Sequence, residues 1–327
     1  MTLLVITVAV ALLFDFTNGF HDTANAVATT VSTRALSPRV AVAIAALANL
    51  GGAFATTAVA KTVGKGIIDT SLATEKTVLA AVIGAIVWNL FTWWLGLPSS
   101  SSHALIGGLI GAAVVKSGVH GVQWHGIVHK VVIPALWAPA IAFAVSFALL
   151  VGIYWAFKWM TPGLGNRTFR IGQLATGTWV GFTHGANDAQ KTMGVIALAL
   201  YSEGRIDHFF IPTWVKVAAG LAIAAGTYSG GWRIMRTLGQ RVYQLEPPSG
   251  FAAQASAGAV IWASTKYGYP LSTTHVVSGA VMGAGATKRL SAVRWGVAGN
   301  IVFAWLLTIP AAAAVAAACY WPVEAIF

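Results

Sequence analysis

A polar motif occurs twice in this chain, each time inside a long apolar segment. The first copy, FTNGFHD, covers Phe16–Asp22, and the second copy, FTHGAND, covers Phe182–Asp188. An aspartate at the centre of a membrane helix costs about 2.5–3.5 kcal/mol on insertion scales. Packing alone does not explain why a whole group of polar residues is duplicated in such surroundings. We therefore expect both carboxylates, Asp22 and Asp188, to take part in the function.

Apolar residues dominate the rest of the chain. Of its 327 residues, 57% are hydrophobic and 9% are charged, whereas about 25% of residues are charged in a typical soluble domain. Several apolar segments approach the roughly 20 residues that a spanning helix needs. They lack the period-two alternation of a membrane β-strand. The sequence therefore predicts an all-α, polytopic protein embedded in a lipid bilayer.

The charge balance is strongly basic, with a net charge of +11. In a membrane protein this excess is explained first by basic cytoplasmic loops and lipid headgroups, so no nucleic-acid partner is expected. A permeant anion is a second possible beneficiary of a basic surface. The single cysteine, Cys319, excludes an internal disulfide and a thiolate metal site.

The apolar segments predict the order of the spans. We expect a first span over Leu3–Ser32, discontinuous at Gly19–Asn25, because backbone groups freed at membrane depth must be satisfied inside protein or a wet cavity. Further spans are expected over Val40–Ala60 and Val78–Leu97. The first half then closes with the apolar stretch Val131–Phe157.

A serine-rich segment, PSSSSH at Pro98–His103, precedes the short apolar stretch Ala104–Val115. That stretch is too short to span a bilayer. We interpret the pair as a re-entrant hairpin or half-helix whose beginning is lined with hydroxyls. The alternative is a serine-rich surface loop that leads into a short helix.

The histidines suggest two other possible functions, a metal site and a hydrolase active site. Three lie in the connection that follows: His120, His125 and His129. Without nearby Cys, Asp or Glu partners, a solvated interfacial loop is preferred over a metal site. An intramembrane hydrolase could pair His21 and Asp22 with His103 or His275, but no metalloprotease-type pattern supports it. We expect no enzyme.

The second half of the chain repeats the first. The basic segment at Lys61 and the serine segment at Pro98 recur at offsets of 175 and 172 residues, and the aspartate motif recurs at an offset of 166. We predict a first transmembrane repeat at 1–157, a polar linker at 158–170 and a second repeat at 171–327. Interrupted apolar segments at corresponding places in two repeats indicate the binding site of a transporter. An inverted relation between the repeats is expected, with the sidedness left open.

The Ser/Thr segments and the aspartate motifs suit two different kinds of ligand. Hydroxyls and helix N-termini bind oxyanions, and carboxylate and amide oxygens bind hard cations. An anion binds poorly beside bare carboxylates and better once a cation or proton neutralises them. The candidate cation residues are Asp22, Asn25 and Asp188. The candidate anion residues are Ser100, Ser101, Ser102, Ser272, Thr273, Thr274, Asn187 and Lys191.

Both aspartate motifs, with the continuation Thr23–Ala26, and the two Ser/Thr-His segments resemble the inorganic phosphate transporter (PiT) family. The resemblance covers nearly the whole chain. It implies uptake of inorganic phosphate coupled to co-transported sodium or protons, without another cofactor. It also implies an inverted-repeat core, a homodimer and a multi-pass location in the plasma (inner) membrane. Some relatives carry sulfate, so another oxyanion stays open as an alternative, and a passive anion channel is a further one.

The second motif departs from the family pattern at Ala189–Lys191, where Lys191 stands at the position that Asn25 holds in the first half. Three residues after Asp188 on a helix, Lys191 would share its face. The ammonium could replace one mobile cation or contact the anion. Alternatively, it could reach the interface and touch neither.

Overall fold

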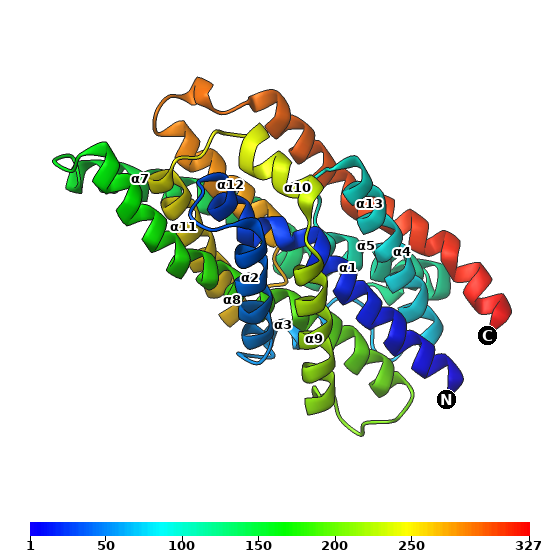
Figure 1. Cartoon of the computed structure of the whole chain (residues 1–327). Helices are drawn as coiled ribbons and strands as arrows, with labels where there is room; N and C mark the ends of the chain where they lie inside the picture. The colour runs from blue at the N-terminus through cyan, green and yellow to red at the C-terminus, as the bar shows by residue number, and fades with distance from the viewer.

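The computed structural model describes residues 1–327, leaving aside the side chain of Gln240, and the regular elements it describes are helices (Figure 1). In chain order they are α1 (Thr2–Ser32), α2 (Pro38–Gly52), α3 (Ala58–Lys65), α4 (Glu75–Leu95), α5 (Ser101–Ser117), α6 (Trp124–Ile127), α7 (Ile133–Ala156), α8 (Pro162–Ser202), α9 (Thr213–Ser229), α10 (Trp232–Arg236), α11 (Pro247–Lys266), α12 (Thr273–Ala286) and α13 (Trp295–Ile326). Short π-helical segments follow α6 and α10, at Val128–Val132 and Thr237–Arg241.

Four helical segments of the described chain are long and apolar enough to cross a membrane: Thr2–Ser32, Glu75–Leu95, Trp124–Ala156 and Trp295–Ile326. Their outward faces carry large apolar side chains, as lipid-facing helices do. The all-α, multi-pass membrane architecture expected from the sequence is therefore confirmed.

The polar motifs do not break their helices, so the prediction of a discontinuous helix at Gly19–Asn25 was wrong. Both α1 and α8 run without interruption through their motifs. Polar side chains in these segments bond to their own helix, as Thr23 does by donating to the Gly19 carbonyl at 2.7 Å, or face neighbouring helices. Because the backbone ladder stays closed, no main-chain group has to be satisfied elsewhere.

Two other segment boundaries differ from the sequence expectations. The segment expected to form one span at 40–60 divides into α2 and α3, separated by residues 53–57. Gly52, at the end of α2, lies so close to α8 that an added Cβ would meet the Phe182 carbonyl oxygen at 2.0 Å. The segment expected to be a polar linker, 158–170, includes the beginning of α8 at Pro162.

Helices of the two halves exchange partners. α1 packs on α9 and α8 packs on α2, while α5 packs on α13 and α12 packs on α7. Matching glycines allow these close contacts, because a Cβ at Gly107 would meet the Ile309 carbonyl of α13 and one at Gly279 would meet the Pro139 carbonyl of α7. Each half therefore completes the packing of the other.

α1 and α8 run in opposite directions through the bundle (Figure 1). Where α1 begins and α8 has just ended, the Arg205 guanidinium lies 3.0 Å from the Met1 sulfur. Where α1 ends and α8 begins, Arg170 donates to the Thr33 carbonyl at 3.1 Å. The termini of the chain lie at the same end of the molecule.

α5 and α12 begin at the Ser/Thr segments and their first turns meet. Ser100 and Ser272 are the N-caps, and their hydroxyls accept from the backbone N–H of His103 and His275 at 3.1 and 3.2 Å. The two histidine rings pack edge to face with centroids 4.7 Å apart. The expectation that hydroxyls line the beginning of two short helices is confirmed, and their re-entrant course through a bilayer stays a prediction.

Candidate substrate and cation site

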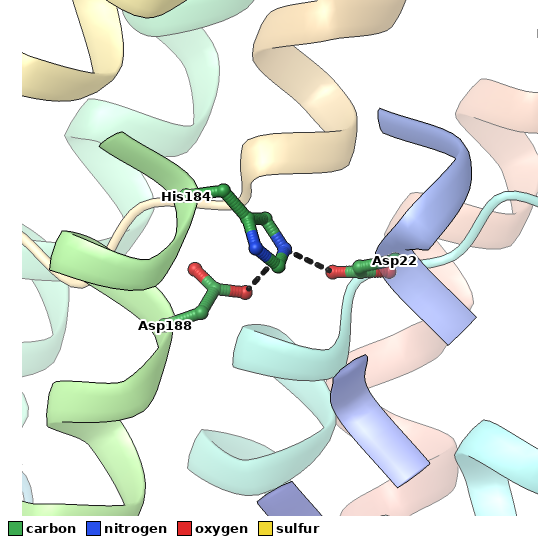
Figure 2. A group of neighbouring side chains, drawn as sticks. All are labelled: Asp22, His184 and Asp188. Carbon is green, nitrogen blue, oxygen red and sulfur yellow. Dashed lines mark ion pairs between the residues drawn. The ribbon is translucent and has the colours of Figure 1, made fainter. Parts of the chain in front are cut away.

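The two motif aspartates meet at the contact between α1 and α8, with a histidine between them (Figure 2). His184 Nε2 lies 4.0 Å from Asp22 Oδ2 and 3.5 Å from Asp188 Oδ2. Asp22 is 2% exposed, and the other two side chains are fully buried. Two carboxylates and an imidazole therefore share one water-poor centre.

The hydrogen bond at Nδ1 of His184 determines which ring nitrogen carries the proton. Asn49 of α2 donates from its amide nitrogen to Thr227 Oγ1 at 2.8 Å, so its amide oxygen faces His184 Nδ1 at 2.9 Å. His184 Nδ1 must therefore carry a proton, and in a neutral ring Nε2 presents a lone pair to the two carboxylates. The Nε2 lone pair and the two carboxylate oxygens that face it repel one another, so the arrangement requires a cation or a proton among Asp22, His184 and Asp188. These ligand atoms all lie within 4.8 Å of one another, close enough to hold one ion.

Asp22 also connects to the threonines of the other half. The hydroxyls of Thr274 and Thr273 lie 3.4 and 3.5 Å from its two carboxylate oxygens. Asn25, one turn later, donates to Thr274 Oγ1 at 2.9 Å and leaves its amide oxygen without a partner. Asp22, Asn25, Thr273 and Thr274 thus offer the oxygen ligands that suit a hard cation.

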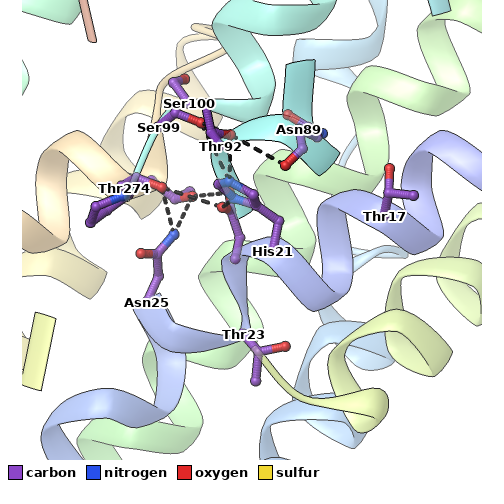
Figure 3. Close-up of polar contacts among 12 residues, drawn as sticks. Thr17, His21, Thr23, Asn25, Asn89, Thr92, Ser99, Ser100 and Thr274 are labelled. Atoms are coloured by element: carbon purple, nitrogen blue, oxygen red, sulfur yellow. Dashed lines mark hydrogen bonds and ion pairs between the residues drawn. The ribbon is translucent and has the colours of Figure 1, made fainter. Parts of the chain in front are cut away.

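A histidine that the sequence-based assignment did not include orients Asp22. His21 Nδ1 lies 2.6 Å from Asp22 Oδ1. Its Nε2 lies 3.2 Å from Thr92 Oγ1 and 3.3 Å from Ser99 Oγ, and these two hydroxyls bond to each other at 2.8 Å (Figure 3). The ring is therefore fixed at both nitrogens.

In the second half a lysine takes the corresponding place. The Lys191 ammonium lies 2.5 Å from Asp188 Oδ1, donates to the Leu271 carbonyl at 2.8 Å and contacts the Ser102 hydroxyl. All three of its hydrogens have acceptors within the protein. The shared helix face predicted for Asp188 and Lys191 is confirmed. The side chain is 1% exposed, so it does not reach the interface.

The two halves are cross-connected through these contacts. Asn25 of the first half bonds to Thr274 of the second, and Lys191 of the second half bonds to Ser102 of the first. Each motif therefore completes its surroundings with the short helix of the other half.

The remaining predicted anion residues are distributed unevenly. Among the six hydroxyl residues, Ser101 alone has an oxygen without a hydrogen-bond partner in the described structure. Ser100 and Ser272 act as N-caps, and Ser102, Thr273 and Thr274 bond within the site. Asn187 lies elsewhere and donates to Thr265 Oγ1 at 2.8 Å and to the Tyr269 carbonyl at 3.1 Å.

The ligand-binding residues assigned from the sequence did not include several residues of the site: His21, His184, Asn49, Thr92 and Ser99. The first two lie inside the repeated motif, which was a usable signal. Asn49 is a lone amide in an apolar segment and gives no such signal. His120, His125 and His129 are exposed, as expected of a solvated connection.

Comparison with known proteins agrees with this geometry. The profile of the phosphate transporter family matches twice, at residues 18–164 and 160–316. The chain is 51% identical to a probable low-affinity inorganic phosphate transporter of Mycobacterium leprae, over 99% of this chain and 79% of that one. It is 47% identical to the corresponding protein of Rhizobium meliloti, over 98% and 97%.

A solved structure described as the sodium-dependent phosphate transporter superimposes on the whole of both chains with a TM-score of 0.92 at 27% identity. The named relatives are transporters, which confirms the expectation that the chain is not an enzyme. This chain belongs to the phosphate transporter family.

Proposed function

We propose that the chain imports inorganic phosphate across the plasma membrane together with a cation, sodium or a proton. The observation that carries this proposal is the convergence of three buried acceptors, Asp22, His184 and Asp188, on one point. Such a point is stable only when it is occupied by positive charge. If a cation must bind between these three side chains before phosphate binds, the transport of phosphate is coupled to the transport of the cation.

The facing first turns of α5 and α12 are the proposed anion site. The first N–H groups of a helix have no intrahelical partners, and its dipole attracts negative charge. Two such ends meet here, with the unpartnered Ser101 hydroxyl among them. A phosphate held there lies near the carboxylates, so bare carboxylates weaken its binding and a cation strengthens it.

The two halves hold their positive charges differently. In the first half, Asp22, Asn25, Thr273 and Thr274 would bind a mobile cation. In the second half, the Lys191 ammonium occupies the equivalent place between Asp188 and Ser102. We therefore assign Lys191 as a tethered cation, which reduces by one the number of ions moved with each phosphate.

The distribution of the arginines supports an inverted arrangement with both termini outside the cell. α1 begins at the end of the bundle where α8 stops, so the repeats start on opposite sides. Every arginine except Arg205 belongs to segments at the other end: Arg34, Arg39, Arg167, Arg170, Arg233, Arg236, Arg241, Arg289 and Arg294. Lysines occur at both ends, with Lys65 and Lys76 on the side of the termini, so the positive-inside rule favours a cytoplasmic location for the other end through the arginines alone. The resemblance to the family further suggests a homodimer, testable by light scattering in detergent.

Uptake by proteoliposomes tests the function. Labelled phosphate should accumulate inside vesicles when a sodium or proton gradient is imposed, and unlabelled sulfate in tenfold excess should not compete. Accumulation of sulfate instead would reassign the substrate. Phosphate flux that merely equilibrates, with or without an ion gradient, would contradict coupling and indicate a channel.

A further inference from the structure

A short helix, α3, lies between the site and the end of the bundle where the chain begins. Its first turn contacts Gln190 of α8, the residue that precedes Lys191. Its last residue is Lys65, whose ammonium lies 5.3 Å from the ring centroid of Phe209 in the α8–α9 connection, which lies at that end. α3 therefore extends from the level of Lys191 to the end assigned to the exterior.

The position of α3 depends on its contacts, because an isolated helix of fewer than about 12 residues is marginally stable in water. It has eight residues, and the irregular segment 53–57 separates it from α2. Its buried face packs so closely on α8 that a Cβ at Gly194 would meet the Ala60 carbonyl oxygen at 2.5 Å and Val63 Cβ at 3.1 Å. Lys61 and Lys65 are exposed on the opposite face.

The Gln190 side chain caps the beginning of α3 from another helix. Its amide oxygen accepts from the backbone N–H groups of Val59 and Ala60 at 2.9 and 3.2 Å. Its amide nitrogen donates to the Ala186 carbonyl. Gln190, Val59 and Ala60 are all 0% exposed. Without this oxygen, two buried N–H groups at the start of a helix would lose their acceptor, so α3 would have to move or water would have to enter.

The other side of α3 packs on the turn that leads into α12. At Gly268, where φ is +72°, an added Cβ would lie 3.0 Å from the Ala58 carbonyl oxygen and 3.2 Å from Thr62 Oγ1. Three residues later, the Leu271 carbonyl accepts from the Lys191 ammonium at 2.8 Å. α3 therefore contacts both α8 and the turn whose carbonyl holds the proposed tethered cation.

In the second half, the residue that corresponds to Gln190 cannot cap the equivalent break, which lies at 230–231 between α9 and α10. That residue is Ala24, at the 166-residue offset between the motifs, and its side chain has no acceptor. α1 instead holds the end of α9, where Thr23 donates to the Thr227 carbonyl at 3.1 Å. The glutamine cap therefore distinguishes the exterior break from its counterpart.

We propose that α3 is the gate of the site on the exterior side and that Gln190 is the positioning residue that holds it closed. Gln190 follows Asp188 by two residues on the same helix, so a change in what the site binds acts directly on the two bonds to α3. The segment 53–57 then acts as the hinge that lets α3 leave α8 without displacing α2. This role rests on the proposed phosphate transport, because a carrier opens its site to one side at a time.

The accessibility of a buried cysteine tests the gate independently of transport. Cys319→Ser removes the single native cysteine, and Val63→Cys introduces a reporter on the buried face of α3. In intact cells, a membrane-impermeant maleimide should label this reporter slowly. Gln190→Met has a similar size but no acceptor oxygen, and it should raise the labelling rate about tenfold, the change expected for a lost hydrogen bond. Gln190→Glu keeps acceptor oxygens and should label at nearly the wild-type rate.

Gln173 provides the matched control, because it is a fully buried glutamine near the other end of α8, bonded to Thr33 and to the Pro247 carbonyl. Gln173→Met should leave the labelling of Val63→Cys unchanged. A second reporter, Ala142→Cys on the buried face of α7, reacts only when the whole protein unfolds. If Gln190→Met exposes that reporter as well, Gln190→Asn, whose side chain is shorter, takes its place.

Uptake kinetics separate a gate from a merely structural role. A protein biased towards the exterior-open state binds external phosphate at least as well but completes fewer transport cycles. Gln190→Met should therefore lower the maximal rate and the half-saturating phosphate concentration together, whereas a loss of folded protein lowers the maximal rate alone.

Unchanged labelling of Val63→Cys in folded Gln190→Met would overturn the proposal. An equal increase in Gln173→Met, or labelling only from the cytoplasmic face of inverted vesicles, would overturn it too. If the wild type takes up no phosphate but Gln190→Met still raises the labelling rate, the gate is supported and the proposed function is contradicted. Normal phosphate uptake by the wild type, with no effect of Gln190→Met on labelling, contradicts the gate alone.

Discussion

The two halves of the molecule contain the same motif but neutralise its aspartate in different ways. Asp22 is surrounded by hydrogen-bonding groups that can rearrange around an ion, namely Asn25, Thr273 and Thr274. Asp188 is paired directly with the buried Lys191. In the proposed mechanism, the difference between Asn25 and Lys191, each the third residue after its aspartate, exchanges a mobile charge for a permanent one.

The aspartates should produce the largest effect. Asp22→Asn keeps the shape of the side chain but removes the negative charge that holds the mobile cation, so coupled phosphate uptake should fall to the background of empty vesicles. Asp188→Asn leaves the Lys191 ammonium buried without its counterion, and breaking a buried pair costs about 3–5 kcal/mol. It should lower both uptake and thermal stability. Proteoliposome uptake and unfolding midpoints check both variants, and normal uptake with normal ion dependence in either would contradict its role.

Substitution of Lys191 is the most direct test of the difference between the two halves. Replacing it by asparagine makes the second half resemble the first, so Lys191→Asn should bind an additional mobile cation and show a steeper sodium or proton dependence of uptake. Lys191→Gln and Lys191→Ala provide no matched ligand geometry and should mainly reduce uptake. The measurement is the number of ions moved per phosphate. An unchanged stoichiometry and substrate affinity in Lys191→Asn would make the lysine a bystander.

The hydroxyl shell should show a smaller effect. Ser101 has the unpartnered hydroxyl nearest the two helix starts, so Ser101→Ala should raise the apparent phosphate constant about tenfold, the loss expected for one hydrogen bond to a charged group. Ser100→Ala and Ser272→Ala also remove helix caps and should lower stability as well. Affinity that stays unchanged across all alanine variants of the six hydroxyl residues would move the anion site elsewhere.

The sequence predicted an all-α membrane protein, the duplication and most polar residues of the site. Each of these can be recognised from apolar segments and short motifs along the chain. It did not predict the unbroken α1, since the number of polar residues in a segment does not reveal that they bond to neighbouring helices. The sequence also did not predict the contact between Lys191 and Ser102. That contact depends on the exchange of helices between halves, which no periodicity encodes. His184 was visible in the motif, but its position between Asp22 and Asp188 results from the crossing of α1 and α8.

The smallest effect concerns the groups that orient Asp22 indirectly. Ser99 bonds to His21 Nε2 and to Thr92. Ser99→Ala therefore removes a neutral hydrogen bond and leaves the residues proposed to bind the cation and phosphate in place. Such a bond contributes roughly 0.5–1.5 kcal/mol. Ser99→Ala should therefore raise the sodium or proton concentration for half-maximal uptake by a few-fold, while the maximal rate changes little.

Thr265→Val is the matched variant in the second half, where the Thr265 hydroxyl accepts from Asn187 and donates to the Ile261 carbonyl, not to Asp188. It should leave the cation dependence unaltered, because Lys191 already neutralises Asp188. Equal shifts in the two variants would contradict the distinction between a mobile and a tethered charge. A shift in Ser99→Ala alone would support it, since only in the first half does the cation affinity depend on how well His21 holds its carboxylate.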